Sequence, residues 1–137
     1  MHWTPLIALH TSFALGALAL GPVALWARLG RVQRPRWHRT AGYAWVVCMV
    51  GAAFSALFIR ATVLPLFAGL GLIHLLVLLT FGQLWLAFAA LRRGRIAAHR
   101  QAMQGLYIGA CLVAGAFTLL PGRLLGQLLW GQWLGLL

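Results

Sequence analysis

Four long apolar segments without a charged side chain constrain this 137-residue chain more than any other feature. A bilayer core about 30 Å thick needs about 20 consecutive apolar residues in a helix. A single arginine at a helix centre costs roughly 2.5–3.5 kcal/mol on insertion scales, so uncharged segments of this length favour lipid-embedded helices. We expect an all-α integral membrane protein, one domain over residues 1–137, with spans at residues 5–26, 40–59, 63–91 and 102–120.

Short connections between these segments predict an up-down-up-down bundle of four transmembrane helices. Pro5 and Pro65 are expected at helix starts, where the missing N–H costs nothing. Pro121 is expected to end or kink the fourth helix. The tail, residues 122–137, carries Trp130 and Trp133 among leucines, and tryptophan favours the headgroup level. We therefore expect the tail to lie in the outer interface.

Orientation follows from the arginines, which gather in the first and third loops. By the positive-inside rule these loops face the cytoplasm, so both termini are expected on the non-cytoplasmic side of a bacterial inner membrane. The opposite side has only Arg60 and Arg123. The loop arginines are Arg28, Arg31, Arg34, Arg36 and Arg39 in the first loop, and Arg92, Arg93, Arg95 and Arg100 in the third.

The chain has eleven positive charges and no Asp or Glu. This composition excludes paired-carboxylate hydrolysis, carboxylate-bound Mg²⁺ or Ca²⁺ and carboxylate proton relays. Because the arginines lie between apolar spans, the expected partners are anionic lipid headgroups, not nucleic acid. Cys48 and Cys111 fall inside spans, where we expect unpaired, reduced thiols that pack as small apolar residues.

The two halves of the chain resemble each other. His38-Arg39 precedes the second span, and His99-Arg100 precedes the fourth, each after a basic loop. Cys48 and Cys111 follow at similar offsets, and Gly51-Ala52-Ala53-Phe54 is echoed by Gly115-Ala116-Phe117. We interpret this pattern as two helical hairpins related by a pseudo-two-fold axis along the membrane normal.

Four histidines fall into two layers of the expected bundle. His10 lies about 9 Å inside the outer face and His74 about 14 Å past Pro65, at 1.5 Å per residue. His38 and His99 share the cytoplasmic level. In a square bundle these are two diagonal pairs, and two facing imidazoles can ligate a haem iron. His2 is expected to be a solvated terminal residue.

Small and aromatic residues flank these histidines and suggest slots for a macrocycle. Arg39 and Arg100 are expected near enough to pair with haem propionates. The flanking residues are Ala14, Ala17 and Gly21 on the His10 face, Phe67, Phe81 and Trp85 on the His74 face, and Gly42, Trp45, Met49 and Ala56 behind His38.

A structural interpretation remains open for the same residues. Small residues against aromatics are ordinary packing between membrane helices, and His38 and His99 at the interface are compatible with simple solvation. His10 and His74 within the apolar layer point more to function, because polar groups there are rare and usually functional. Either histidine can still hydrogen-bond a neighbouring helix without a ligand. Copper or zinc at a two-histidine site is disfavoured, since no cysteine or carboxylate completes the shell.

A family resemblance rests on landmarks in a fixed order along nearly the whole chain. They are His10, the run from Trp37 to Met49, Gly71-Leu72-Ile73-His74-Leu75-Leu76, Arg92-Arg93-Gly94, His99-Arg100-Gln101-Ala102-Met103 and Leu120-Pro121-Gly122-Arg123. This pattern resembles the bacterial membrane family designated domain of unknown function 2306, which implies a membrane location. The histidine placement alone is similar to that of di-haem cytochromes of the b561 class, which implies electron transfer between the two membrane faces.

The leading hypothesis is a haem b protein that carries electrons across the inner membrane, to or from quinone or another redox partner. His10 and His74 would ligate an outer haem, and His38 and His99 an inner one. Two alternatives stay open: a non-enzymatic membrane subunit that packs against a larger partner, and a small transporter.

Overall fold

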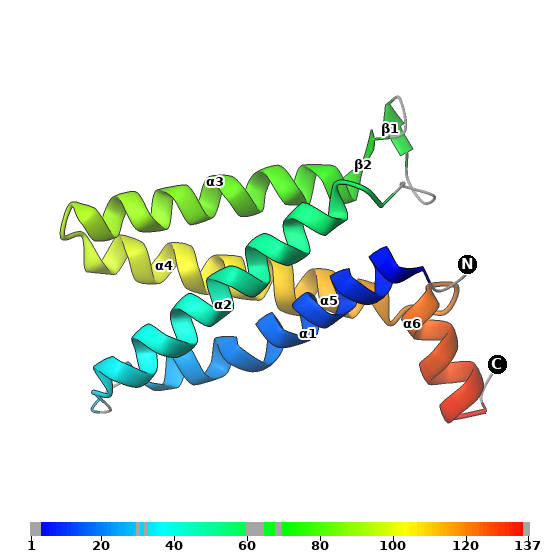
Figure 1. Cartoon of the computed structure of the whole chain (residues 1–137), viewed down its shortest axis with the longest axis horizontal. Coiled ribbons are helices and arrows are strands. Elements are labelled where there is room, and N and C mark those ends of the chain that lie inside the picture. Colours follow the sequence, from blue (N-terminus) through cyan, green and yellow to red (C-terminus); the bar gives the residue numbers. More distant parts are fainter. Residues whose placement is uncertain (1–3, 30, 32, 60–64, 68–69, 136–137) are drawn as a thin grey trace.

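The computed structural model describes residues 4–29, 31, 33–59, 65–67 and 70–135 (Figure 1). Helices α1 (Pro5–Trp26) and α2 (Pro35–Ala56) form the first antiparallel hairpin. Strands β1 (Pro65–Phe67) and β2 (Leu70–Gly71) pair antiparallel and lead into α3 (Leu72–Arg92). The prediction of an all-helical chain is confirmed over the described residues, apart from this one short strand pair.

The fourth helical run consists of α4 (Ile96–Leu106), the π-helical segment η1 (Tyr107–Val113) and α5 (Ala114–Thr118). It lies antiparallel to α3 and completes the second hairpin (Figure 1). A turn at Pro121 and Gly122, which has a φ of 90°, ends the run, as the sequence predicts.

The C-terminal tail is helical, with α6 (Leu124–Gly126) continuing into the π-helical segment η2 (Gln127–Trp133). The indole of Trp130 donates from Nε1 to the Leu119 carbonyl at 2.7 Å, which ties the tail to the end of the fourth run. Trp133 is 81 % exposed. An interfacial position for the tail stays a prediction.

The first helix begins and ends where the sequence predicts. The Thr4 side chain accepts a hydrogen bond from the Ile7 N–H at 3.2 Å, and Pro5 occupies the first turn. Both features are typical of helix starts, because the first N–H groups have no intrahelical partner. The second helix begins at Pro35, before the predicted start at residue 40, so Trp37, His38 and Arg39 extend the helix beyond the apolar segment.

The third helix begins at Leu72, and the prediction that Pro65 starts it is wrong. Pro65 lies in β1, paired with Gly71 in β2. The Gly69-Leu70-Gly71 sequence is unfavourable for helix, and α3 begins directly after it. The first two residues of the predicted span, 63 and 64, lie outside the described part. As a result His74 is the third residue of α3 and lies in its first turn.

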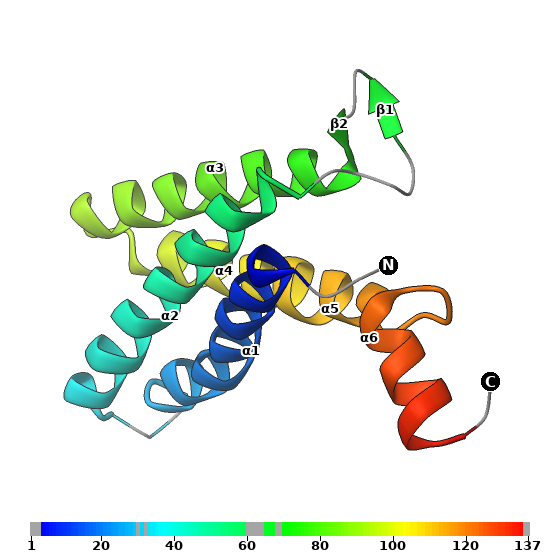
Figure 2. The same cartoon turned by 45° about the vertical axis from the view of Figure 1, so that its right-hand side comes forward.

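The two hairpins pack closely within themselves and less extensively against each other. The most extensive inter-hairpin contacts are between α2 and α3 and between α1 and η1. Figures 1 and 2 show that the loop joining α1 to α2 lies well apart from the loop joining α3 to α4. The hairpins therefore diverge toward their arginine-rich loops.

A tyrosine in η1 makes the central contact between the hairpins. Pro22 lies inside α1 and has no N–H to give to the Leu18 carbonyl four residues earlier. The Tyr107 hydroxyl donates to that carbonyl at 3.2 Å. Gly21 leaves the space for the tyrosine ring, since a Cβ there would collide with it. The Tyr107 hydroxyl thus supplies the hydrogen bond that Pro22 cannot give to the Leu18 carbonyl.

Two of the described helices are long and apolar enough to cross a membrane by length and composition. They are α1, with a mean hydropathy of 1.7, and α3, with 2.0. Only a small share of each is buried within the chain, 11 % and 22 %. Leucine, valine, phenylalanine and tryptophan side chains cover much of the outer surface. Such a surface suits hydrocarbon and not water.

Candidate functional site

The same hydrogen bond occurs near the loop of each hairpin. His38, the fourth residue of α2, lies 2.9 Å from the Ala24 carbonyl of α1 through Nδ1. His99, the fourth residue of α4, lies 3.0 Å from the Ala87 carbonyl of α3, also through Nδ1. Each histidine thus reaches back to the preceding helix of its own hairpin, which matches the predicted correspondence between the halves.

These contacts settle which ring nitrogen carries the proton in the neutral imidazole. A carbonyl oxygen only accepts, so Nδ1 of His38 and of His99 must donate. Nε2 then keeps its lone pair, and within the described residues no hydrogen bond reaches Nε2 of either ring. A metal-binding histidine characteristically donates its other N–H to a backbone carbonyl in this way.

His10 is held similarly but deeper in the first hairpin. Its Nδ1 lies 2.9 Å from the Ala52 carbonyl and 3.2 Å from Ser55 Oγ, both on α2. Ser55 is buried and donates to the Gly51 and Ala52 carbonyls at 2.8 and 3.0 Å. His10 therefore donates from Nδ1 and leaves Nε2 as an acceptor.

His74 differs from the other three histidines. Its Nδ1 accepts from the Gly71 N–H at 3.3 Å, so its proton must be on Nε2. Nε2 donates to the Leu57 carbonyl, at 3.4 Å. Both ring nitrogens are engaged, and the ring serves as a cap for its own helix. His2, the fifth histidine, lies outside the described residues.

The fit of haem to the two predicted pairs is therefore unequal. Axial ligation needs an imidazole nitrogen with a lone pair. Both rings of the inner pair, His38 and His99, have one at Nε2. In the outer pair His10 has one, whereas Nε2 of His74 carries a proton and is hydrogen-bonded.

Side chains predicted to line a slot beside His74 face away from the bundle. Trp85 is 73 % exposed and Phe81 37 %, so neither side chain is packed inside the chain, and their contact with a macrocycle stays a prediction. Phe67 lies in β1, of which only the backbone is described. The buried face of α3 is instead formed by Val77, Thr80, Leu84 and Ala87. The exposed positions Phe81 and Trp85 each follow by one residue a position of this buried face, Thr80 and Leu84.

The predicted small-residue face of α1 is confirmed, but other side chains fill part of it. Ala17 and Gly21 are buried, and Ala14 is half-buried. Tyr107 and Trp45 occupy the space at Gly21. On α2, Trp45, Met49 and Ala56 are buried, whereas a Cβ added at Gly42 would meet nothing within 4 Å.

The two arginines beside the inner histidines are both exposed. Arg100 donates from Nη2 to the Arg28 carbonyl at 2.7 Å, which links α4 to the end of α1 across the hairpins. No described residue forms a hydrogen bond with Arg39. Arg100 therefore has a structural contact of its own, while Arg39 stays available to an anionic group.

Sequence reasoning did not reveal a sulfur-rich cluster in the core. Cys111 lies in η1 and donates from Sγ to Sδ of Met49 on α2 at 3.6 Å. Cys48 and Met103 pack against the same core as half-buried residues. Both cysteines are free, as predicted. Their environments differ, since Cys48 points at Gly16 of α1.

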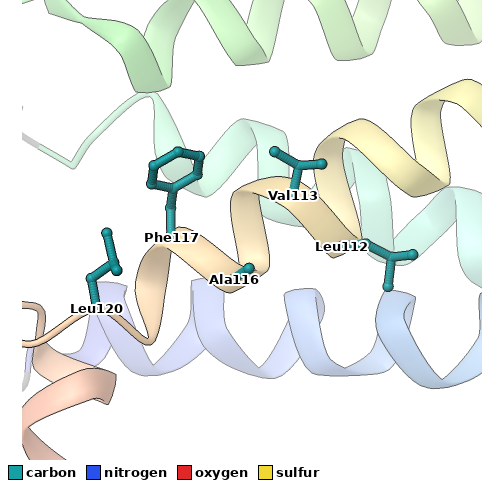
Figure 3. A pocket seen from close by; sticks show the side chains of 5 residues that line it. All are labelled: Leu112, Val113, Ala116, Phe117 and Leu120. Carbon is teal, nitrogen blue, oxygen red and sulfur yellow. The ribbon is translucent and has the colours of Figure 1, made fainter.

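An apolar hollow of about 380 Å³ opens on the outside of the fourth run (Figure 3). It has no histidine, cysteine or methionine in its wall and offers no ligand to a metal. Across the described residues, no three His, Cys, Asp or Glu side chains are grouped to hold a metal ion. The lining residues are Leu112, Val113, Ala116, Phe117 and Leu120.

These observations define a helical membrane protein with two hairpins. In each hairpin, a histidine near the loop hydrogen-bonds the preceding helix. Residues 7–125 match the family of predicted membrane proteins known as DUF2306, so the chain belongs to that family. No curated protein and no solved structure matches the chain. The family resemblance seen in the sequence is thereby confirmed, and the likeness to b561 cytochromes remains an analogy in histidine placement.

Proposed function

We propose that all four helical runs cross the membrane. Helix α2 is about 33 Å long and the run from Ile96 to Thr118 about 34 Å, at 1.5 Å per residue, which is enough for a 30 Å core. Arg36 and Arg39 lower the hydropathy of α2 at its start, and Arg100 does the same for α4. The arginine loops face the cytoplasm of a bacterial inner membrane, with both termini on the other side.

The function best supported by the site is the binding of one haem b at the cytoplasmic level, with His38 and His99 as axial ligands. A single observation carries this proposal. The two rings occupy matching positions in the two hairpins, with Nδ1 held by a carbonyl and Nε2 left with its lone pair. Bound there, haem supplies one-electron oxidation and reduction.

The surrounding residues contribute orientation and charge. The Ala24 and Ala87 carbonyls fix the ring planes and raise the basicity of Nε2. Arg39 would pair with a propionate, a negatively charged group of a kind that this chain does not itself contain. Arg100 uses one of its five N–H donors for the Arg28 carbonyl and would pair with a propionate through the others.

The proposal does not extend to a second haem at His10 and His74. The Nε2–H of His74 donates to Leu57 and Nδ1 accepts from the Gly71 N–H, so neither ring nitrogen can ligate an iron without the loss of at least one of these bonds. The protein is therefore proposed as an electron carrier at the cytoplasmic face, with quinone or a redox protein as partner. Transfer across the whole membrane would need a further redox centre.

The alternative of a non-enzymatic membrane subunit has an observation in its favour. The bonds from His38 to Ala24 and from His99 to Ala87 tie each hairpin together without any ligand. Under this alternative the histidines contribute stability only. No contact among the described residues favours a transporter.

The deciding experiment is a reduced-minus-oxidised visible spectrum of detergent-purified protein expressed with ample haem, with haem quantified per chain. The proposal expects one haem per chain in the wild type and no haem after His38→Ala or His99→Ala. His10→Ala, which removes a similarly anchored ring at another level, is the matched control and should keep its haem. A colourless wild type, or loss of haem only with His10→Ala, rules the inner site out.

A further inference from the structure

The sulfur-bearing side chains of this protein are concentrated in one place. Apart from Met1, the chain has four of them, Cys48, Met49, Met103 and Cys111. All four belong to or pack against the core cluster that contains Trp45 and Tyr107. Two come from α2 and two from the fourth run, so the cluster joins the two hairpins.

Within this cluster, one cysteine and one methionine are at the right distance to share an ion. Sγ of Cys111 lies 3.6 Å from Sδ of Met49. Two sulfurs bound to one ion through bonds of about 2.3 Å can be at most about 4.6 Å apart, so a separation of 3.6 Å is within reach of one shared ion. Met49 is 5 % exposed, which places its thioether inside the bundle.

A buried hydrogen-bond donor points to a ligand at the same place. Trp45 is 4 % exposed, and its Nε1–H is buried without an oxygen or nitrogen partner in the described structure. The sulfur of Cys111 lies beside it. A thiol is a weak acceptor, whereas a metal-bound thiolate accepts strongly. Deprotonating Cys111 would therefore satisfy a donor that is otherwise costly to bury.

We infer that Cys111 and Met49 form a binding site for Cu(I), with Trp45 as the residue that hydrogen-bonds the coordinating sulfur. Thiolate and thioether ligands select Cu(I) over harder ions. Structural zinc needs four ligands of the nitrogen, sulfur or carboxylate type, and no three such groups lie together in the described residues. Calcium and magnesium need oxygen ligands, which this cluster lacks.

The chemistry of binding balances without a redox step. The Cys111 thiol releases its proton to the buffer, and the thiolate forms a bond with Cu(I). Met49 adds a lone pair from its neutral thioether. The ion and the thiolate carry opposite unit charges, so the bound unit is neutral and avoids the high cost of a lone charge in the apolar interior.

Cys48 provides a matched control for this assignment. It is the neighbour of Met49 in α2 and packs against the same core. Its sulfur, however, faces α1, because it would lie 2.9 Å from a Cβ added at Gly16. Serine at position 48 removes one thiol and leaves the proposed ligands in place.

The experiment is an anaerobic competition for Cu(I) between a chromophoric chelator and reduced, haem-free protein in detergent. We expect one Cu(I) per chain in the wild type and after Cys48→Ser, and none retained after Cys111→Ser. Trp45→Phe removes the N–H that would donate to the coordinating sulfur and should weaken binding roughly 10–100-fold. Met49→Leu removes a ligand and should weaken binding at least as much. Because haem-free protein is used, the result does not depend on the haem proposal.

A second measurement on the wild type covers the case in which a variant fails to fold. Cu(I) should protect Cys111 from alkylation by N-ethylmaleimide, as read by mass spectrometry, and leave the rate at Cys48 unchanged. A wild type that retains no Cu(I), equal protection of both cysteines, or loss of binding with Cys48→Ser would each overturn the inference.

Discussion

In the first hairpin His38 of α2 reaches a carbonyl near the end of α1, and in the second His99 of α4 reaches a carbonyl of α3 in the same way. At the far ends the hairpins differ. His10 of α1 bonds to Ala52 and Ser55 in the last turns of α2, whereas His74 of α3 caps its own helix. The fourth run also contains a π-helical segment that α2 lacks. The halves are thus alike near the loops, where we place the haem, and have diverged on the opposite side.

The largest expected effect concerns the one glycine of α1 that the second hairpin requires. In Gly21→Ala the new Cβ collides with the ring of Tyr107, which is buried and bonded to Leu18. Overpacking of this kind lowers the free energy of unfolding by about 1–3 kcal/mol or more. Thermal unfolding followed by circular dichroism in detergent should show a clear loss of stability.

The matched control is Gly82→Ala in α3, the first helix of the second hairpin. A Cβ at Gly82 has no neighbour within 4 Å. Alanine favours helix over glycine by roughly 0.5–1 kcal/mol. Gly82→Ala should therefore be at least as stable as the wild type in detergent. Equal destabilisation by the two variants would show that α1 and η1 do not meet as described.

The next effect separates the two histidine anchors. At the end of α1 the Arg28 N–H bonds to the Leu25 carbonyl, so His38 supplies the donor that Ala24 otherwise lacks. Ala87 lies inside α3, where its carbonyl also accepts the N–H four residues on. His38→Ala leaves the part-buried Ala24 carbonyl without a donor and should therefore cost about 1–2 kcal/mol, whereas His99→Ala should cost only about 0.5–1.5 kcal/mol.

Both histidine variants are to be measured by thermal unfolding in haem-free protein, so that ligand binding does not contribute. Asparagine at position 38 offers a partial replacement, because its amide N–H can donate to a carbonyl. Recovery of stability in His38→Asn would identify the lost hydrogen bond as the cause. A larger loss at His99 than at His38 would contradict the asymmetry between the hairpins.

The sequence predicts local features of this fold well, because their causes are local. Thr4 and Pro5 mark the start of α1, and Pro121 ends the fourth run. The correspondence between His38 and His99 is visible as a repeated dipeptide after a basic loop. Hydropathy alone, however, merges the strand pair at residues 65–71 with α3, since leucine, phenylalanine and glycine there are as apolar as the helix.

The remaining features depend on partners far away in the sequence. Cys111 and Met49 are 62 positions apart, and Tyr107 and Leu18 are 89 apart, so no spacing rule brings them together. The tautomer of His74 is set by the Gly71 N–H, which donates to Nδ1 from the residue directly before the helix. A helix that began at Pro65, as predicted, would not bring these two groups together in this way. The prediction that His74 lies well inside its helix is therefore wrong, because α3 begins only at Leu72.

The smallest expected effect concerns how the second helix of each hairpin ends on the side away from the arginine loops. After α2, the Leu57 carbonyl accepts from Nε2 of His74 at 3.4 Å; after α5, the Leu119 carbonyl accepts from Nε1 of Trp130 at 2.7 Å. Trp130→Phe keeps an aromatic ring and removes the donor, and should cost about 0.5–1.5 kcal/mol, the net value of one hydrogen bond. Amide hydrogen exchange should then accelerate in the tail, residues 124–133, and stay unchanged in α2. If exchange in the tail is unaffected, the tail is held by lipid contact alone, and the two helix ends are not equivalent in the way that these two carbonyls suggest.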